Sequence, residues 1–247
     1  MKHKLEKVVT CPLCGHKEFT HHLSCVDHNY SNDVFDISSC NVCLFKFTNP
    51  RPTGDTIHKY YISDHYISHT SSKKGLFNKV YHIVRNYQFG YKYRLIKKNL
   101  AQVNNISLLD FGCGTGDFLN YCNQKGMHCR GAEKDDGARN MGKRNFNLSI
   151  LEELEEVESK KEKFDVITLW HVLEHIKDFK LLLRRLKELL NENGLLILGL
   201  PNHNSFDAQI FKENWVAYDV PIHLSHFSQN NIKDLVNTLS FKSLSTK

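Results

Sequence analysis

Leu108-Leu109-Asp110-Phe111-Gly112-Cys113-Gly114-Thr115-Gly116-Asp117 is the stretch that decides the fold of this chain. An apolar strand ends at an acidic residue, three glycines follow at alternate positions, and a helical pattern begins after them. Because glycine has no Cβ, the backbone can turn sharply here and a ligand can lie against the peptide amides. The next helix adds N–H groups that lack helical partners. The stretch therefore predicts a ligand-binding turn between a strand and a helix.

The spacing of the glycines argues against a dinucleotide. That fingerprint reads G-x-G-x-x-G, whereas Gly112, Gly114 and Gly116 are spaced G-x-G-x-G. A ligand without phosphate needs a carboxylate for its cationic or hydroxyl groups, and Asp110 is placed for that role. A glycine-rich turn without a ligand is the structural alternative.

A second acidic residue follows at the end of the next expected strand. His128 to Glu133 reads as a short buried strand, and Glu133 closes it. Ligands of open parallel sheets bind outside the carboxyl ends of the strands. Glu133 would therefore stand beside the glycine turn and accept hydrogen bonds from ribose hydroxyls, unless it is simply solvated.

Strands and helices alternate from Ile106 onward. This alternation predicts an α/β fold with a mostly parallel sheet and helices on both faces. The expected strands are 106–111, 128–133, 147–151, 164–170, 194–200 and 241–246. The expected helices are 116–125, 136–144, 178–191 and 228–239.

Several motifs in this order resemble those of class I S-adenosylmethionine-dependent methyltransferases of type 11/23: LLDFGCGTGDF (108–118), GAEKD (131–135), FDVITLWHVLEHIKD (164–178), GLLILGLPN (194–202) and VPIHLSHFS (220–228). The resemblance implies a Rossmann-like sheet and S-adenosylmethionine as cofactor. It also implies that the glycine turn holds the methionine part, that Glu133 holds the ribose, and that the end of the fourth strand lies beneath the sulfonium. The cofactor residues are then Asp110, Gly112, Cys113, Gly114, Gly116, Glu133, Leu169, Trp170 and His171.

Two C-x-x-C pairs define a module over residues 1–50. Cys11 and Cys14 are followed, after a gap of 25 residues, by Cys40 and Cys43. Four thiolates at this spacing can close a tetrahedral Zn²⁺ site, which is structural rather than catalytic. The metal would supply folding energy that so small a core lacks. A zinc-ribbon-like module is the main interpretation, and a redox pair, a lost metal and a nucleic-acid-binding finger are the alternatives.

A linker and a helical segment over residues 51–104 lead into the methyltransferase domain, 105–247. No acidic residue occurs between His65 and Leu109, where basic and aromatic residues interleave. The basic stripe could attract phosphate groups of a nucleic acid, a nucleotide-sugar or a lipid, or it is a solvated helix face.

Histidines concentrate in two stretches that the alternation places after strands. His171 follows the fourth strand, and Tyr218, His223 and His226 follow the fifth. These four residues are the catalytic candidates, because either stretch could supply a general base. The zinc module before the methyltransferase domain resembles the arrangement of sugar C-methyltransferases. That resemblance implies a base beside a sugar carbonyl, a task suited to His223 or His226 with Tyr218. VLEH (172–175) also resembles part of a metal-binding E-x-x-E-H pattern, which leaves open whether Glu174 and His175 bind a metal or orient the loop.

The composition of the chain indicates its compartment. The chain has 247 residues, a formal net charge of +6 and eight cysteines. Paired cysteines indicate zinc and a reducing compartment, and neither a secretory signal nor a membrane-spanning run is visible, so we expect a cytoplasmic protein. The expected acceptor is a small molecule or a nucleotide- or carrier-linked sugar. RNA methylation and a non-catalytic partner protein are the alternatives. The family's C-terminal hairpin is expected to be incomplete, since the sequence ends at Lys247.

Overall fold

The computed structural model describes residues 4–61, 76–100 and 104–242, and within 76–83 it describes the backbone only. The chain forms two compact units. Unit 1 contains residues 1–72, 173–181 and 200–247, and unit 2 contains residues 73–172 and 182–199.

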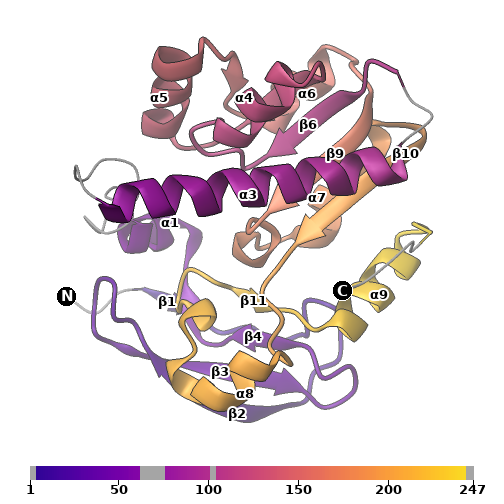
Figure 1. Ribbon diagram of the computed structural model, residues 1–247. Coiled ribbons are helices and arrows are strands. Elements are labelled where there is room, and N and C mark those ends of the chain that lie inside the picture. The colour runs from indigo at the N-terminus through magenta and orange to yellow at the C-terminus, as the bar shows by residue number, and fades with distance from the viewer. Residues whose placement is uncertain (1–3, 62–75, 101–103, 243–247) are drawn as a thin grey trace. The chain divides into compact units, whose positions relative to one another are not determined.

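Unit 2 is built on a five-stranded parallel sheet (Figure 1). The strand order is β10-β9-β6-β7-β8. Strands β7 and β8 therefore lie on one side of β6, whereas β9 and β10 lie on its other side. The direction in which strands are added reverses between β6 and β9. Ligand crevices of open α/β sheets lie at such a reversal. The strands are β6 (Ser107–Phe111), β7 (His128–Ala132), β8 (Ile150–Leu151), β9 (Phe164–Trp170) and β10 (Leu190–Gly199).

The helices of unit 2 bury apolar side chains against this sheet. Their core joins the C-terminal end of α3 to α4 and to the middle of β6 and β9, through Ile96, Leu108, Phe118, Leu119, Cys122 and Val166 among others. The helices are α3 (Leu76–Asn99), α4 (Asp117–Gln124), α5 (Asp136–Phe146), α6 (Leu154–Ser159) and α7 (Phe179–Glu188), of which α7 begins within unit 1.

Unit 1 contains a four-stranded antiparallel sheet of order β11-β4-β3-β2. Three of its strands come from the cysteine-rich segment: β2 (Phe19–Val26), β3 (Val34–Cys40) and β4 (Lys46–Thr48). The fourth, β11 (Ser225–His226), comes from the far end of the sequence. A separate pair joins β1 (Leu5–Glu6) to β5 (Arg51–Pro52).

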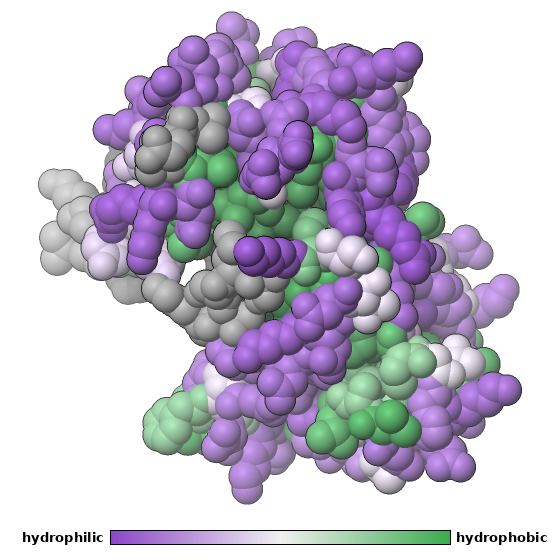
Figure 2. All heavy atoms as spheres, turned by 90° about the vertical axis from the view of Figure 1, so that its right-hand side faces the viewer, coloured by the Kyte–Doolittle hydropathy of each residue, from purple (hydrophilic) through white to green (hydrophobic). Residues whose placement is uncertain are grey.

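Short helices complete unit 1. They are α1 (Gly54–Ile57), α8 (Phe206–Phe211), α9 (Gln229–Thr238) and the 3₁₀ helices His58–Tyr61, Leu173–His175, Lys212–Asn214 and Val216–Tyr218. The apolar core joins the β3 side chains Phe35 and Ile37 to Trp215, Tyr218 and Ile222 from the segment after β10. In the view of Figure 2 the surface is mostly hydrophilic with smaller hydrophobic areas. None of the described helices is long and apolar enough to cross a bilayer.

The expected α/β fold is confirmed, and the differences lie at element ends, in the strand expected over 241–246 and in the short strand β11, which was not expected. Strand β8 begins only at Ile150, because Asn147 takes a left-handed conformation (φ +54°) that closes α5. Of the strand expected over 241–246, Phe241 and Lys242 lie in no strand, and the remaining positions fall outside the described residues.

Candidate functional site

The glycine turn after β6 has the backbone conformation that only glycine adopts readily. Gly112, Gly114 and Gly116 all have positive φ, at +73°, +56° and +74°. A Cβ on Gly112 would collide with the side chain of Val172, and one on Gly116 would lie 2.5 Å from Leu148 Cδ1. Two of the glycines are therefore required by close packing as well as by the turn.

Gly114 differs from the other two because nothing lies within 4 Å of the position its Cβ would take. Its N–H donates to Glu133 Oε2 at 2.8 Å. The turn therefore presents an open stretch of backbone beside a carboxylate from the end of β7. This is the arrangement expected of a site for a ligand that lies flat against the peptide.

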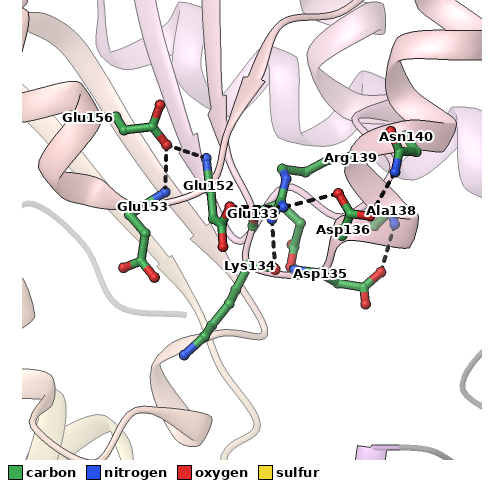
Figure 3. Close-up of polar contacts among 10 residues, drawn as sticks. All are labelled: Glu133, Lys134, Asp135, Asp136, Ala138, Arg139, Asn140, Glu152, Glu153 and Glu156. Carbon is green, nitrogen blue, oxygen red and sulfur yellow. Dashed lines mark hydrogen bonds and ion pairs between the residues drawn. The ribbon is translucent and has the colours of Figure 1, made fainter.

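Further contacts fix both the carboxylate and the backbone of Glu133. Its Oε1 accepts the Asp135 N–H at 2.9 Å. The Arg139 guanidinium donates to the carbonyl oxygens of Glu133 and Lys134 at 2.8 and 2.7 Å, and it also contacts the carboxylates of Asp136 and Glu152 (Figure 3). Arg139 thus fixes the backbone that carries Glu133. Sequence reasoning missed this residue, whose one signal is a basic side chain in the first turns of the following helix.

Asp110 lies inside unit 2 at the end of β6, directly opposite Thr168 of β9. Its carboxyl group is fully buried, and Thr168 Oγ1 donates to Oδ1 at 2.6 Å. Burial raises the pKa of Asp110 to about 7, although the Thr168 hydrogen bond and the nearby Lys92 lower it. A cationic group beside Asp110 would stabilise the ionised form.

Lys92 of α3 is a second site residue that sequence reasoning missed. Its Nζ lies 4.3 Å from the centre of the Trp170 ring and 5.4 Å from that of Phe118. Burial lowers the pKa of Lys92, while the Asp110 carboxylate raises it. The sequence showed a basic stripe on this helix, but not which of its members turns inward.

The end of β9 carries the other expected cofactor residues. Leu169 is buried within the sheet, and the Trp170 ring packs on Gly199, where a Cβ would come within 2.6 Å of it. His171 follows with φ +57°, and its N–H donates to the Gly199 carbonyl at 2.9 Å. The Cys113 side chain lies against Gly131 of β7, at 2.7 Å from the place of its Cβ, and burial raises the pKa of this thiol.

The four cysteines of the module lie together in unit 1. Cys11 Sγ is 3.6 Å from Cys43 Sγ, Cys14 Sγ is 3.5 Å from Cys40 Sγ, and all four sulfurs lie within 4.8 Å of one another. Sulfurs of a tetrahedral site with Zn–S bonds of about 2.3 Å lie about 3.8 Å apart, so the donors fit Zn²⁺.

The two cysteine pairs also share a backbone turn. The residue after each second cysteine, Gly15 or Leu44, has a positive φ, and its N–H donates to the carbonyl of the first cysteine. A repeated turn of this kind, with the four sulfurs converging, is compatible with a zinc-ribbon-like module.

His223, His175 and Glu174 form a second group of donors in unit 1, with ligand atoms within 4.8 Å of one another. His223 Nδ1 lies 2.9 Å from the Ala217 carbonyl, and His175 Nδ1 lies 3.2 Å from the Ile222 carbonyl. A carbonyl only accepts, so His223 Nδ1 donates to Ala217. His175 Nδ1 also lies 3.1 Å from the Tyr61 hydroxyl, and His223 Nε2 lies 3.9 Å from an Asp219 carboxylate oxygen. Such a group can accept a proton or bind a metal ion.

Tyr218 and His226 lie in the interior of unit 1. Their rings contact each other edge to face at 5.3 Å, and His226 Nε2 lies 3.1 Å from Thr48 Oγ1. Since Thr48 Oγ1 donates to the His223 carbonyl, it accepts from His226. Burial lowers the pKa of His226 well below its ordinary value and raises that of Tyr218 to about 12. Of the three candidate residues after the fifth strand, Tyr218, His223 and His226, only His223 belongs to the second group of donors. His171 belongs to unit 2.

Comparison with known families supports the assignment made from the glycine turn. A family model described as a methyltransferase domain matches residues 84–246, which is well over half of the chain. The chain belongs to this methyltransferase family. The ubiquinone biosynthesis O-methyltransferase of Azorhizobium caulinodans is 30% identical over 135 residues, covering 50% of this chain and 52% of the relative. The (S)-coclaurine N-methyltransferase of Thalictrum flavum subsp. glaucum is 32% identical over 110 residues, covering 40% and 30%. The chain spans about half the length, or less, of these relatives.

Solved structures support the same fold. Magnesium protoporphyrin IX methyltransferase (ChlM) from Synechocystis PCC 6803, with bound SAH, has a TM-score of 0.56 at 14% identity and covers 76% of this chain and 89% of its own. The plantazolicin methyltransferase BpumL in complex with SAH has a TM-score of 0.50 at 20% identity, with 59% of each chain covered. At these identities the likeness concerns the fold alone.

Proposed function

We propose that this protein transfers a methyl group from S-adenosylmethionine to a small molecule or to a nucleotide- or carrier-linked sugar. The observation that carries the proposal is the open backbone at Gly114, flanked by the carboxyl groups of Asp110 and Glu133. Family membership and the methyltransferase names of the relatives support it. Bound S-adenosylmethionine would supply a methyl group activated by its sulfonium.

Each proposed cofactor residue has a task that follows from its chemistry. Asp110 would face the amino group of the methionine part, since a buried carboxylate gains most from a cation. Lys92 would hold the methionine carboxylate, because it carries positive charge close to Asp110. Glu133 would bind the ribose hydroxyls with the lone pairs that its two N–H partners leave available.

We propose His223 as the base that removes a proton from the acceptor. Its Nδ1–H is held by the Ala217 carbonyl, so Nε2 is the ring atom that would take up the proton, and it lies 3.9 Å from an Asp219 carboxylate oxygen. Positioning of the reactants accounts for roughly 7–11 kcal/mol of such a barrier, and a general base adds about 10²–10⁴ in rate. Because Glu174 and His175 complete a possible metal-binding group, a divalent metal at these donors is the alternative that metal titration tests.

The four cysteines would hold one Zn²⁺ that stabilises unit 1. A closed set of four thiolates leaves no coordination position for a substrate, so the metal would have no step in the transfer. We consider RNA a weaker candidate for the methyl acceptor than a small molecule, because two basic residues of the stripe already make contacts within unit 2. Arg85 pairs with Asp117 at 3.1 Å, and Lys92 lies over the Trp170 ring.

The cofactor proposal is tested by calorimetry with S-adenosylhomocysteine. Gly114→Arg should abolish binding, since its side chain would fill the open space and its φ of +56° disfavours any Cβ. Gly54→Arg is the matched control, because Gly54 also has open space around its Cβ position but lies in unit 1. Equal affinity of the two variants would contradict the proposed site.

The proposed base is tested separately. His223→Asn should lower turnover of methyl acceptors by about 10²–10⁴ while affinity for S-adenosylhomocysteine stays unchanged. His21→Asn, at an exposed histidine of the same unit, serves as control. Full turnover in His223→Asn would remove this residue from the role.

A further inference from the structure

A row of polar side chains crosses one face of the four-stranded sheet of unit 1. His226 of β11 lies opposite Lys46 of β4, Lys46 lies opposite Ser39 of β3, and Ser39 lies opposite Thr20 of β2. Directly opposed residues of neighbouring strands point to the same face of a sheet. Four strands therefore bring an ammonium, an imidazole and two hydroxyl groups into one line, which the methyl-transfer proposal does not use.

Lys46 is the centre of this row and is only half exposed. Its Nζ lies 3.2 Å from His203 Nδ1. An ammonium can only donate, so His203 accepts with Nδ1 and is neutral. One N–H of Lys46 is thereby satisfied. Among the residues that the structure describes, Lys46 forms no ion pair with a carboxylate.

The surroundings of Lys46 are basic rather than acidic. Burial, together with the charges of Lys46 and His22, lowers the pKa of His203 to about 4. Burial also lowers the pKa of Lys46 itself. His22, on the same strand as Thr20, has its pKa lowered by burial and by Lys46. A partly buried cation is normally paired, and here the described neighbours of Lys46 are neutral imidazole and hydroxyl groups in place of a counter-ion.

We propose that Lys46, Ser39 and His203 form a binding site for a phosphate group. The ammonium supplies the charge, and hydroxyl and imidazole N–H groups can donate to further oxygens. An oxyanion bound here would give Lys46 the counter-charge that the described residues do not supply. The phosphate is either free inorganic phosphate or the phosphate of a larger molecule. Its assignment to the methyl acceptor rests on the proposed function, whereas the site itself does not.

The test is calorimetry of the zinc-loaded full chain, without S-adenosylmethionine, at constant ionic strength. The probes are inorganic phosphate, glucose 1-phosphate and uridine diphosphate, with chloride as the reference anion. We expect Lys46→Met to weaken binding of the preferred probe at least tenfold and Ser39→Ala severalfold. Lys17→Met, at an exposed lysine of the same unit, should bind like the wild type. Preference for a nucleotide or sugar phosphate over inorganic phosphate would identify an organic ligand, and the reverse order would identify the free ion.

Imidazole NMR of the wild type gives a second readout that does not depend on a variant folding. Phosphate should shift the resonances of His203 and His22 and raise their pKa, while those of the exposed His58 stay in place. The proposal is overturned if no probe binds more tightly than chloride, if Lys46→Met binds like the wild type, or if His58 responds as strongly as His203. Calorimetry with S-adenosylhomocysteine remains a separate measurement, so loss of one site leaves the other testable.

Discussion

Asp110→Asn should make the protein more stable at pH 8 and less able to bind S-adenosylhomocysteine. The wild-type carboxyl group is fully buried at the end of β6 and accepts a hydrogen bond from Thr168. Burial raises its pKa from 3.8 to about 7. A buried acid with a raised pKa holds its proton more tightly in the folded state than in the unfolded chain. Its contribution is therefore fully favourable below pH 4 and is lost as the pH rises toward 7.

The size of the effect follows from the shift. A change of one pKa unit corresponds to about 1.4 kcal/mol, so a shift from 3.8 to about 7 lowers the free energy of unfolding by about 4 kcal/mol at pH 8. The amide cannot ionise and avoids this loss, but it weakens the hydrogen bond with Thr168 and the attraction to Lys92, at a cost of about 1–2 kcal/mol. We expect Asp110→Asn to gain about 2 kcal/mol at pH 8 and to lose about 1 kcal/mol at pH 4.

Urea denaturation at several pH values, without cofactor, measures this difference. Asp165→Asn is the control, since hydrogen bonds from Ser107 and Asn191 outweigh burial and lower the pKa of Asp165. That variant should be destabilised at pH 8 and less so at pH 4. If Asp110→Asn is equally or less stable than the wild type at pH 8, or if its effect does not change between pH 4 and 8, the reasoning about Asp110 is wrong.

Three further predictions concern the same features. Affinity for S-adenosylhomocysteine should rise with pH and level off above about pH 7, because Asp110 must ionise to attract the ligand's ammonium; calorimetry should find this rise missing in Asp110→Asn. Gly116→Ala should lower the free energy of unfolding by about 2–3 kcal/mol in urea denaturation, since a positive φ costs about 1–2 kcal/mol and the new Cβ would lie 2.5 Å from Leu148. Gly126→Ala, with φ +84° and open space around the Cβ position, should show only the cost of the positive φ. Metal analysis should find one Zn²⁺ per chain, and its removal should unfold the β2–β4 sheet by circular dichroism; retention of that sheet in the metal-free protein would contradict the structural role.

The sequence was most informative where local chemistry determines the backbone. Alternating glycines after an apolar strand predicted the turn at Gly112–Gly116, and the apolar run 164–170 coincides with β9. Positive φ and the need for space are properties of single positions, so the residue type reveals them. The four cysteines were likewise readable, because metal-ligand spacing is a local pattern.

Contacts between distant segments were not readable. Ser225–His226 was predicted to lie in a loop, yet it is the edge strand β11, because its pairing with β4 depends on the fold rather than on its own residues. Lys92 was one of several basic residues in the stripe, and nothing in the sequence analysis singled out Arg139. One lies over Trp170 and the other on the carbonyls after β7, and both contacts arise only from tertiary structure.

The pairing of β11 with β4 also affects how this protein can be made and divided. Thr48 and His226 are separated by 178 residues in the sequence. During synthesis the β4 edge of the cysteine-rich sheet therefore stays unpaired until the segment around Ser225 has been made. Expression of residues 1–50 alone would leave that edge open to another copy, which favours aggregation. A fusion or domain-exchange experiment should therefore transfer the segment around Ser225 together with the cysteines.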